Sequence, residues 1–447
     1  MQAITGRMAT VLTIAGVDSG GGAGISADLK TFAALGVHGT SVVTSVTAQN
    51  TKGVLDSYDI PAAFIEKQFD AVVSDIRIDC AKTGMLSSPE IVRTVAKLVR
   101  KNKLPLVIDP VMTAEAGGKL LRDEALSVLI VELLPLATVI TPNVFEASVL
   151  SGIEIKAMKD AEKAAVKIYE LGAGAVIVTG GHLAGTDILY NGKTTYVEGK
   201  LVEGGGTHGS GCTHSAAITA GLAKGYGLVD AAILAKRFVG NAIRNGVRIG
   251  GGVAPVNPVG KVFADSDRYR VLVDVEEAVE LVAKNMDSGL VAEVGCNIAM
   301  GIEGAKSETD VAAVSGRIVR LNDAAHPVGC VSFGASSHIA RIVLTAMHYD
   351  SSMRAAMNIK YSQEALFSCS QLGFSVSSFR RQDEPGGIST MEWGIADTIK
   401  REGRVPDVIY DKGGVGKEAM IRLLGREAME VAERAVRIGA MMRITPL

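Results

Sequence analysis

The N-terminal part of the chain joins an apolar run to a glycine-rich loop and then to a helical pattern. Residues 10–15 (TVLTIA) are typical of a buried strand, residues 16–24 (GVDSGGGAG) form the loop, and residues 25–35 have helical periodicity. This order begins a doubly wound α/β fold, in which ligands bind beyond the carboxyl ends of the strands. Asp18 lies at such an end, where its carboxylate either faces the ligand crevice or caps the turn.

Further apolar runs alternate with helical stretches through the first half of the chain. This alternation predicts a parallel sheet covered by helices. Gln49 follows the second predicted strand, and its carboxamide offers a donor and an acceptor that suit the edge of a nitrogen heterocycle. The later predicted strands comprise residues 42–47, 80–84, 104–109, 139–141 and 175–179.

Three oxygen-bearing side chains follow two of these strands. Asp109 ends one strand, and Asn143 and Glu146 lie three residues apart at the start of a helix, so they project on one face. Together they could hold a hydrated Mg²⁺. The alternative is that Asn143 and Glu146 form a capping box after Pro142.

A turn of small residues, 207–217 (THGSGCTHSAA), leads into an apolar helix. Its first backbone N–H groups, at Gly209, Ser210 and Gly211, are free to bind an anion, and the helix dipole adds attraction. Cys212 lies where this field favours a thiolate, so a group able to accept a proton lies beside the anion. The alternative is a plain helix start with a small buried cysteine.

Taken in order, these motifs resemble the hydroxymethylpyrimidine and phosphomethylpyrimidine kinases over about residues 10–248. The resemblance implies a ribokinase-like fold and ATP-dependent, Mg²⁺-assisted phosphorylation of 4-amino-5-hydroxymethyl-2-methylpyrimidine and then of its monophosphate. It also implies that Asp18, Gln49 and Met85 line the pyrimidine pocket, and that Cys212 takes the place of an aspartate base. The segments that carry it are AGVDSGGGAGISADLKTFAALGVHGTSVVTSVTAQNT, AKTGML, DPVM, TPNVFEA, GGH and GSGCT.

One position departs from this family. The family pattern has a lysine where this chain has Thr179, and loss of a cation near the transferring phosphates slows phosphoryl transfer unless another residue replaces it. His208 and His214 flank the anion turn and are candidates, although histidines there commonly pack or cap.

The length of 447 residues predicts two or three domains. Residues 249–267 contain glycines and prolines without periodicity, which indicates a linker. Asp274 is expected to cap an amphipathic helix that reaches Met286. We therefore divide the chain into domains at residues 1–250 and 268–447, joined by a linker at residues 251–267.

The second half contains another small-residue turn that leads into a helix, residues 333–341 (FGASSHIAR). Ser336, Ser337 and His338 lie at its start, as expected of a phosphate cradle. Residues 412–417 (KGGVGK) imitate a P-loop, but Glu418 stands where Ser or Thr would bind Mg²⁺. We expect a glycine turn in which backbone amides and Lys417 could still hold a phosphate.

Several segments of this half resemble ThiN-type thiamine phosphate synthase domains over about residues 270–440. The resemblance implies an α/β/α fold similar to class II aldolases. It also implies a reaction that joins the pyrimidine diphosphate to 4-methyl-5-(2-phosphoethyl)thiazole. Arg317 and His338 are its main site residues, followed by Arg320 and Arg341. The segments are EVGCNI, DVAAVSGRIVR, FGASSHIARIVLTAM, RAAMNIKYS, EP, WG and PDVIYDKGGVGKEAMIRLLG.

Composition narrows the possible partners. The net charge is −2 with 21% charged residues, so no strongly basic face is expected and nucleic acid is an unsuitable partner. The cysteines are scattered without a CxxC motif, which fits a reducing cytoplasm. No apolar run reaches the length of a membrane span. We expect small-molecule substrates and a homodimer or larger homo-oligomer.

Two alternatives stay open at this point. The first half could be a pyridoxal kinase, which acts on a similar heterocyclic alcohol. The second half could be a ThiN-like sensor that binds thiamine phosphate without making it, although such sensors are expected beside a helix-turn-helix.

Overall fold

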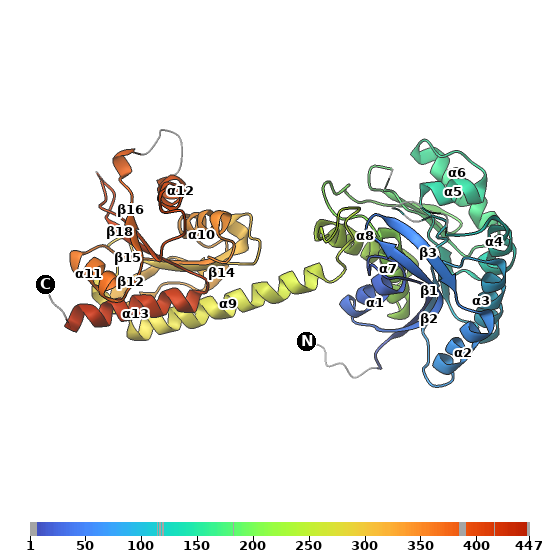
Figure 1. Cartoon of the computed structure of the whole chain (residues 1–447), viewed down its shortest axis with the longest axis horizontal. Helices are drawn as coiled ribbons and strands as arrows, with labels where there is room; N and C mark the ends of the chain where they lie inside the picture. The colour runs from blue at the N-terminus through green and yellow to red at the C-terminus, as the bar shows by residue number, and fades with distance from the viewer. Residues whose placement is uncertain are drawn as a thin grey trace. The chain divides into compact units, whose positions relative to one another are not determined.

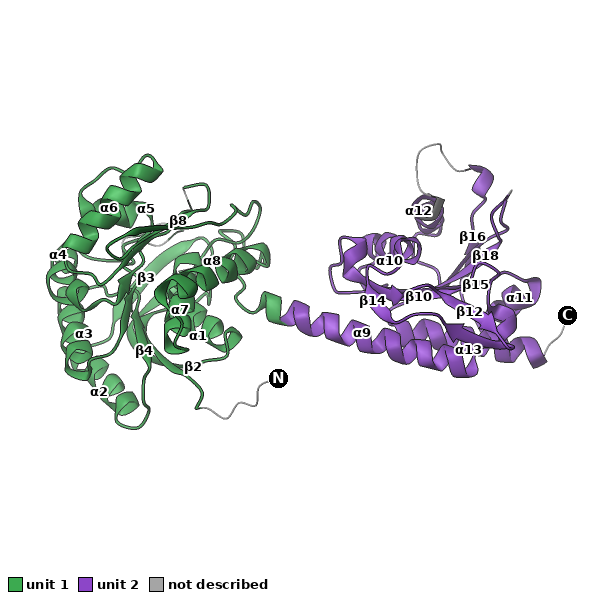
Figure 2. Cartoon of the chain, turned by 180° about the vertical axis from the view of Figure 1, so that it is seen from behind, with its two compact units in different colours: residues 1–262 green, residues 263–447 purple. Residues whose placement is uncertain are grey.

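A computed structural model describes residues 7–113, 115, 118, 120–181, 183–383, 390–414 and 416–444. The chain forms two compact units, Met1–Val262 and Phe263–Leu447 (Figure 2). Each unit has its own sheet and its own buried cores, and each is described separately below.

Unit 1 is built on a nine-stranded sheet of order β3-β2-β1-β4-β5-β6-β7-β8-β9 (Figure 1). Neighbouring strands are parallel across the middle of the sheet, which consists of β2, β1, β4, β5, β6 and β7 in that order. At the two edges, β3, β8 and β9 pair antiparallel with their neighbours. The sequence did not predict these three edge strands. The strands are β1 (Thr10–Asp18), β2 (His38–Asn50), β3 (Gly53–Asp59), β4 (Cys80–Thr83), β5 (Leu106–Ile108), β6 (Val139–Ile140), β7 (Val176–Val178), β8 (Asp187–Tyr190) and β9 (Thr194–Val197).

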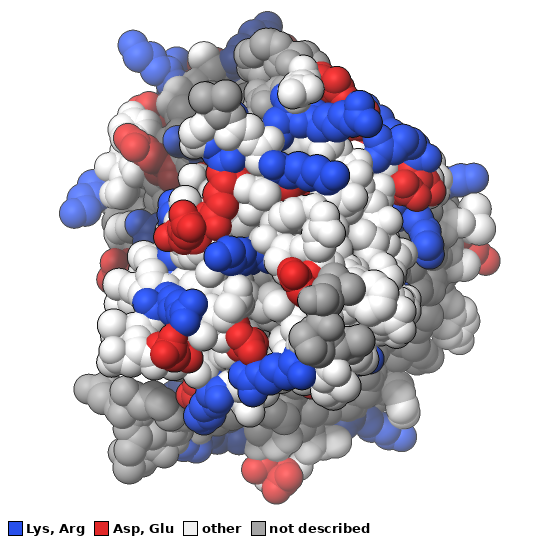
Figure 3. Space-filling model, turned by 90° about the vertical axis from the view of Figure 1, so that its left-hand side faces the viewer, with Lys and Arg blue, Asp and Glu red and all other residues white. Residues whose placement is uncertain are grey.

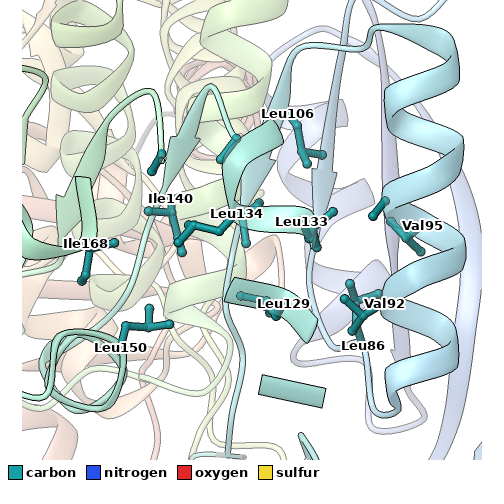
Figure 4. Packing of buried hydrophobic residues seen from close by; sticks show 14 of the residues in the cluster. Leu86, Val92, Val95, Leu106, Leu129, Leu133, Leu134, Ile140, Leu150 and Ile168 are labelled. Atoms are coloured by element: carbon teal, nitrogen blue, oxygen red, sulfur yellow. The ribbon is translucent and has the colours of Figure 1, made fainter. Parts of the chain in front are cut away.

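Helices cover both faces of this sheet, which confirms the doubly wound fold. One core contains Val95, Ile140 and Ile168, contributed by a helix, a strand and a second helix (Figure 4). The helices that supply this core are α2 (Ala62–Val73), α3 (Pro89–Asn102), α4 (Asp123–Val128), α5 (Val144–Ser151) and α6 (Met158–Glu170). The helices that supply the core on the other face are α1 (Gly24–Ala34), α7 (Ser210–Ala223) and α8 (Leu228–Arg244).

Unit 2 contains a seven-stranded sheet of order β14-β11-β10-β15-β18-β17-β16 and a separate hairpin, β12-β13. The neighbours in the main sheet are antiparallel except β16 and β17, which are parallel. The strands are β10 (Asn297–Gly301), β11 (Val311–Val314), β12 (Ile318–Leu321), β13 (Ala324–Pro327), β14 (Val331–Phe333), β15 (Ala355–Lys360), β16 (Val376–Ser378), β17 (Val408–Asp411) and β18 (Met420–Gly425).

Helices also cover both faces of this second sheet, so the expected α/β/α layers are confirmed. The particular likeness to class II aldolases stays a prediction. The helices on one face are α9 (Gly260–Asn285), α11 (Gln363–Gln371) and α13 (Ala428–Ile444). Those on the other face are α10 (Ser337–Tyr349) and α12 (Thr390–Glu402).

The structure differs from the prediction in the second half of the linker and at the start of the next helix. Helix α9 begins at Gly260, inside the expected linker, and it continues through Asp274 to Asn285. Asp274 therefore does not cap its own helix. Its Oδ2 atom accepts a hydrogen bond from the backbone N–H of Ala428 at 2.7 Å, which is the first residue of α13. The prediction that Asp274 caps the helix that follows it was therefore wrong, and the carboxylate caps a helix distant in the sequence.

None of the described helices is both long and apolar enough to cross a membrane. On the face shown in Figure 3, Lys and Arg side chains are interspersed with Asp and Glu. That face therefore does not carry a field of one sign.

Candidate active sites in the two units

The anion turn of unit 1 lies where the sequence predicts it. Gly209 precedes α7 with φ of 82°, a conformation that favours glycine, and a Cβ atom there would lie 1.9 Å from the carbonyl oxygen of Gly22. The turn thus packs directly against the first glycine loop. The N–H of Ser210 donates to the carbonyl of Thr207 at 2.9 Å, so this amide is used by the turn. Gly211 and Cys212 lie in the first helical turn, where amides have no acceptor within the helix.

The predicted thiolate at Cys212 is wrong. Burial raises the pKa of the Cys212 thiol to about 12. The positive charge of Lys82 lowers this pKa, but the negative charges of Asp109 and Asp28 raise it further. The helix field is therefore too weak to offset desolvation and two carboxylates. The thiol is therefore protonated under the influence of Asp109, whose Oδ2 atom accepts a hydrogen bond from the hydroxyl of Ser215 at 2.9 Å.

Lys82 is a site residue that the sequence reasoning missed. Its side chain is fully buried, and its Nζ atom lies 2.8 Å from Oδ1 of Asp28 and 3.8 Å from Oδ2 of Asp109. Burial alone would lower the pKa of Lys82, but Asp28, Cys212 and Asp109 outweigh burial and raise it. The ammonium is therefore a fixed positive charge beneath the anion turn. A lysine inside the apolar run CAKTGML was the available signal.

The predicted metal set is not assembled as three ligands, because Asn143 and Glu146 form the capping box. Asn143 Oδ1 accepts the N–H of Glu146 at 2.9 Å, and Glu146 Oε2 accepts the N–H of Asn143 at 2.9 Å. Within the described residues, no group of three His, Cys, Asp or Glu side chains could hold a metal ion. Burial and the nearby Asp109 raise the pKa of Glu146 to about 8. Asp109 and Glu146 thus remain a close acidic pair.

Asp18 caps its turn, which was the alternative to a free ligand-binding carboxylate. It accepts the backbone N–H groups of Gly20, Gly22 and Ala23 at 2.8, 3.0 and 2.9 Å. Burial raises the pKa of Asp18, but a hydrogen bond with His208 and these amides outweigh burial and lower it. The glycine loop is therefore built around this carboxylate.

The other two predicted pyrimidine contacts lie near Asp18. Nε2 of His208 lies 2.9 Å from Oδ2 of Asp18 and 3.5 Å from Nε2 of Gln49. Met85 is buried, and its Sδ atom would lie 3.1 Å from a Cβ atom at Gly16, two residues before Asp18. The structure thus groups Gln49 and Met85 around the end of β1.

The ammonium group of a lysine on α8 lies near the turn that follows Thr179. Oδ1 of Asp187 accepts the N–H of Gly180 at 2.6 Å and pairs with Nζ of Lys236, also at 2.6 Å. Oδ2 of Asp187 lies 3.2 Å from Nε2 of His214. His214 and His208 are therefore each held by a buried carboxylate. Lys236 is a candidate replacement that the sequence reasoning did not name.

In unit 2, a row of polar side chains crosses the face covered by α10 and α12. Asn297 of β10 lies opposite Asn358 of β15, which lies opposite Arg422 of β18. Directly opposed residues of antiparallel strands share a face. The next residues on this face, Ala299, Ala356 and Leu424, belong to the apolar core with α10 and α12. One end of this face is therefore polar although the rest is a hydrophobic core.

Asp411 holds two arginines at this polar end. Its Oδ2 atom lies 2.7 Å from Nη2 of Arg422, and its Oδ1 atom lies 2.5 Å from Nε of Arg381. Asp411 and Arg422 are fully buried, and Nε of Arg422 has no hydrogen-bond partner among the described residues. Asp411 and Arg422 lie in the segment PDVIYDKGGVGKEAMIRLLG, which carries the resemblance. The sequence did not identify these two residues or Arg381 as site residues.

His338 and Arg317, the main predicted residues, lie in one positive environment. Desolvation lowers the pKa of His338 to about 4, and the charges of Arg422, Arg317, Arg381 and Arg341 act in the same direction. His338 is therefore neutral at pH 7.

Arg317 adopts a φ of 79°, which is uncommon for a residue other than glycine, and its guanidinium donates to the carbonyl of Val294. Arg317 does not pair with Asp310, seven residues earlier in the chain. Asp310 faces Arg268 instead, at 3.6 Å. The guanidinium of Arg317 thus has no carboxylate partner among the described residues.

The weaker candidates divide into two groups. Ser336 and Ser337 lie at the start of α10, and Arg341 pairs with Glu308 at 2.9 Å within the same environment. Arg320 pairs with Asp323 at the β12-β13 turn, and its charge acts on Asp287, the partner of Arg443 on α13. The structure therefore does not bring Arg320 to the site.

Lys417 lies in the loop between β17 and β18. Its backbone exchanges hydrogen bonds with Gly414 at 2.9 and 3.0 Å, so the described residues of KGGVGK, 412–414 and 416–417, lie in a hairpin loop between two strands. A P-loop requires a strand followed by a helix, and rejection of that motif is confirmed. His182 and Glu384–Pro385, which belong to the quoted motifs, lie outside the described residues.

Comparison with known proteins assigns a protein family to each unit. The phosphomethylpyrimidine kinase family matches residues 18–257, and the thiamine-phosphate synthase ThiN family matches residues 274–437. A hydroxymethylpyrimidine/phosphomethylpyrimidine kinase of Rhizobium meliloti is 48% identical over 257 residues, which cover 56% of this chain and 96% of that protein. The Bacillus subtilis pyridoxal kinase, solved as an ADP complex, is 40% identical with a TM-score of 0.54, covering 57% of this chain and 99% of that one. The ribokinase-like fold of unit 1 is thereby confirmed.

One relative spans both units. The bifunctional thiamine biosynthesis protein ThiDN of Methanocaldococcus jannaschii is 38% identical over 427 residues, which cover 95% of this chain and 97% of that protein. This relative and this chain therefore correspond over nearly their whole lengths. The chain belongs to the family of bifunctional thiamine biosynthesis proteins, and it is an enzyme in which a phosphomethylpyrimidine kinase domain precedes a thiamine-phosphate synthase domain.

Proposed function

We propose that unit 1 transfers the γ-phosphoryl group of ATP to the hydroxymethyl group of 4-amino-5-hydroxymethyl-2-methylpyrimidine, and then to the resulting monophosphate. The amides of Gly211 and Cys212 at the start of α7 stabilise the charge on the transferring group. Gln49 and Met85, grouped at the end of β1, are the proposed contacts of the pyrimidine ring.

The proton follows a relay from the alcohol through Cys212 to Asp109. Because the thiol is protonated, it accepts the alcohol proton only as its own proton passes to the Asp109 carboxylate, whose charge acts on it. The alcohol oxygen forms the new bond to phosphorus while the bond from phosphorus to ADP breaks. Lys82 holds Asp109 in place from within the core.

The proposed metal contacts are Asp109 and Glu146, with water completing the shell. Carboxylate oxygens are suitable ligands of Mg²⁺, which usually keeps several waters. When bound, Mg²⁺ would neutralise charge on the phosphates of ATP. Glu146 must lose a proton to serve as a ligand, since its pKa is raised.

We propose that unit 2 joins the pyrimidine diphosphate to 4-methyl-5-(2-phosphoethyl)thiazole, giving thiamine phosphate and pyrophosphate. The bond from the pyrimidine methylene to the diphosphate breaks, and the thiazole nitrogen forms the new bond to that carbon. Arg317 stabilises the departing oxygens, and neutral His338 donates a hydrogen bond to them. The observation that carries the proposal is the group of arginines around His338 at the start of α10.

One coupled reaction tests both halves. The purified protein is mixed with the pyrimidine alcohol, ATP, Mg²⁺ and the thiazole phosphate, and thiamine phosphate is measured by mass spectrometry. We expect thiamine phosphate and pyrophosphate in equal amounts. Accumulation of the pyrimidine diphosphate without thiamine phosphate, together with binding of added thiamine phosphate, would instead identify unit 2 as a sensor.

A second kinase substrate is favoured by one comparison, the likeness of unit 1 to the Bacillus subtilis pyridoxal kinase. Pyridoxal carries a hydroxymethyl group on a nitrogen heterocycle, so it meets the same geometric demands. We propose that it is at most a minor substrate. The ratio of kcat/KM for the pyrimidine alcohol to that for pyridoxal tests this, and a ratio below one would reverse the assignment.

We further propose a cytoplasmic enzyme that forms a homodimer or larger homo-oligomer. The free state of the cysteines supports a reducing compartment. The edge strand β3 and its neighbours expose Val46, Leu55, Tyr58 and Phe64, which supports self-association at this edge. Light scattering of the purified protein tests the oligomeric state, and a monomer at micromolar concentration would contradict it.

A further inference from the structure

The charges around His338 do not balance. Four arginines influence this histidine, Arg317, Arg341, Arg381 and Arg422. Their carboxylate partners are Asp411, shared by Arg381 and Arg422, and Glu308 and Glu392 beside Arg341. Arg317 donates only to a backbone carbonyl. The arginines thus outnumber the carboxylates that pair with them by one, and a bound anion would neutralise this excess.

The two arginines on Asp411 differ in what they can contact. The side chain of Arg422 is fully buried, whereas that of Arg381 is 13% exposed. Nε and Nη2 of Arg381 are held by Asp411, at 2.5 and 3.1 Å, so one edge of the guanidinium is fixed. The opposite edge carries the Nη1 donors. A guanidinium fixed on one edge presents the other in a defined direction.

Arg422 reinforces this arrangement from the sheet. It lies in the polar row with Asn297 and Asn358, its Nη2 atom holds Asp411, and its buried Nε atom has no partner among the described residues. An unpaired buried donor is costly unless the site binds an acceptor or water. The polar end of this face therefore behaves as an incomplete anion site.

We propose that Arg381 is a substrate-binding residue of the synthase site that holds the diphosphate of the pyrimidine substrate, and that Asp411 positions it. The inference rests on the proposed function of unit 2. Diphosphate is chosen over the single phosphate of the thiazole because two donor groups are available, the guanidinium of Arg317, which has no carboxylate partner among the described residues, and the free edge of Arg381. A ligand with two phosphoryl groups offers one to each of these donors.

The test compares Arg381→Ala, Arg381→Lys and the control Arg443→Ala in the full chain. Arg443 is exposed on α13 and pairs with Asp287. Synthase kinetics on supplied pyrimidine diphosphate give a KM for each substrate, and inorganic pyrophosphate gives an inhibition constant. Arg381→Ala should raise the KM for the pyrimidine diphosphate and the pyrophosphate inhibition constant about 10-fold or more, because a bidentate charged contact is lost. Arg381→Lys should recover part of the loss, and Arg443→Ala should match the wild type.

Other outcomes overturn the proposal. A rise confined to the KM for the thiazole phosphate would assign Arg381 to the other substrate. Unchanged constants with a lower melting temperature would make it a structural partner of Asp411. Calorimetric titration with pyrophosphate separates this inference from the proposed function. If the wild type made no thiamine phosphate but bound pyrophosphate, and Arg381→Ala did not, the anion site would stand without the synthase activity.

Discussion

The carboxylate of Asp109 acts on the thiol of Cys212 and raises its pKa, and this relationship decides how the cysteine can act. A thiol whose pKa is about 12 is not a free base at neutral pH. Paired with Asp109, it can accept one proton while passing on another. The catalytic unit of the kinase is therefore the pair rather than the cysteine alone.

Cys212→Ala should impair both phosphorylations by about 10²-fold or more, as expected for loss of a positioned proton acceptor. Asp109→Asn should have a similar effect, because the relay then lacks its final acceptor. The rates are measured separately on the pyrimidine alcohol and on its monophosphate. Synthase activity on supplied pyrimidine diphosphate should be unchanged. A Cys212→Ala enzyme that phosphorylates at the wild-type rate would make Cys212 structural.

Glu146 gives unit 1 a pH-dependent stability. In the folded state its pKa is raised to about 8 from an ordinary value of 4.5, so it keeps a proton that the unfolded chain releases between these values. Its contribution to stability is present below about pH 4.5 and is lost as the pH rises toward 8. The melting temperature of unit 1 should therefore fall over this range relative to Glu146→Gln. Glu124→Gln, at an exposed position of α4, is the control, and parallel curves for wild type and Glu146→Gln would contradict the assignment.

Lys236 should supply the cation that Thr179 lacks. Lys236→Met removes the ammonium beside Asp187 and should lower kinase kcat/KM on the order of 10²-fold, as for other charge-stabilising groups. Adding Thr179→Lys to this variant should restore part of the rate. The exposed neighbour Arg237→Met should have little effect. If Thr179→Lys gave no recovery, Lys236 would act only as the partner of Asp187.

The units should fold separately, but the cut must respect α9. A piece that begins at residue 268 loses Asp267, which pairs with Arg354 at 3.0 Å and accepts the N–H of Glu303 at 2.6 Å. Residues 260–447 should therefore melt several degrees higher than residues 268–447. Asp267→Ala in the longer piece should reproduce much of the difference. Equal melting temperatures would show that the start of α9 adds nothing to unit 2.

Arg317→Ala should lower synthase turnover by about 10²-fold with little change in melting temperature. The guanidinium has no carboxylate partner among the described residues, so its removal leaves no unpaired charge. Kinase activity should be unaffected. A destabilised protein with near-normal turnover would remove Arg317 from the site.

Local patterns predicted the parts of the fold and site that depend on local sequence. The strands of the parallel sheet, the helix start at the anion turn and the presence of His338 at a second helix start all follow from short runs of residues. What could not be predicted depends on contacts distant in sequence. Asp274 caps α13 rather than its own helix, and Lys82 becomes a buried charge only because α1 brings Asp28 beside it.

The protonation states of the site residues could not be predicted for the same reason, because they also depend on contacts distant in the sequence. A helix N-terminus favours a thiolate, but the sequence does not reveal how deeply Cys212 is buried or that two carboxylates surround it. Likewise, the capping box and the metal site share Asn143 and Glu146, and only the positions of the side chains decide between them. Arg381 and Asp411 lie 30 residues apart and pair across β16 and β17.

The central claim, that two separate sites carry out successive steps, is tested most directly by complementation. Cys212→Ala and Arg317→Ala are each supplied with the pyrimidine alcohol, ATP, Mg²⁺ and the thiazole phosphate, and then as an equal mixture. We predict little thiamine phosphate from either variant alone and restored production from the mixture, because one variant releases the pyrimidine diphosphate that the other consumes. Full production by either variant alone, or none from a mixture of correctly folded proteins, would contradict the claim.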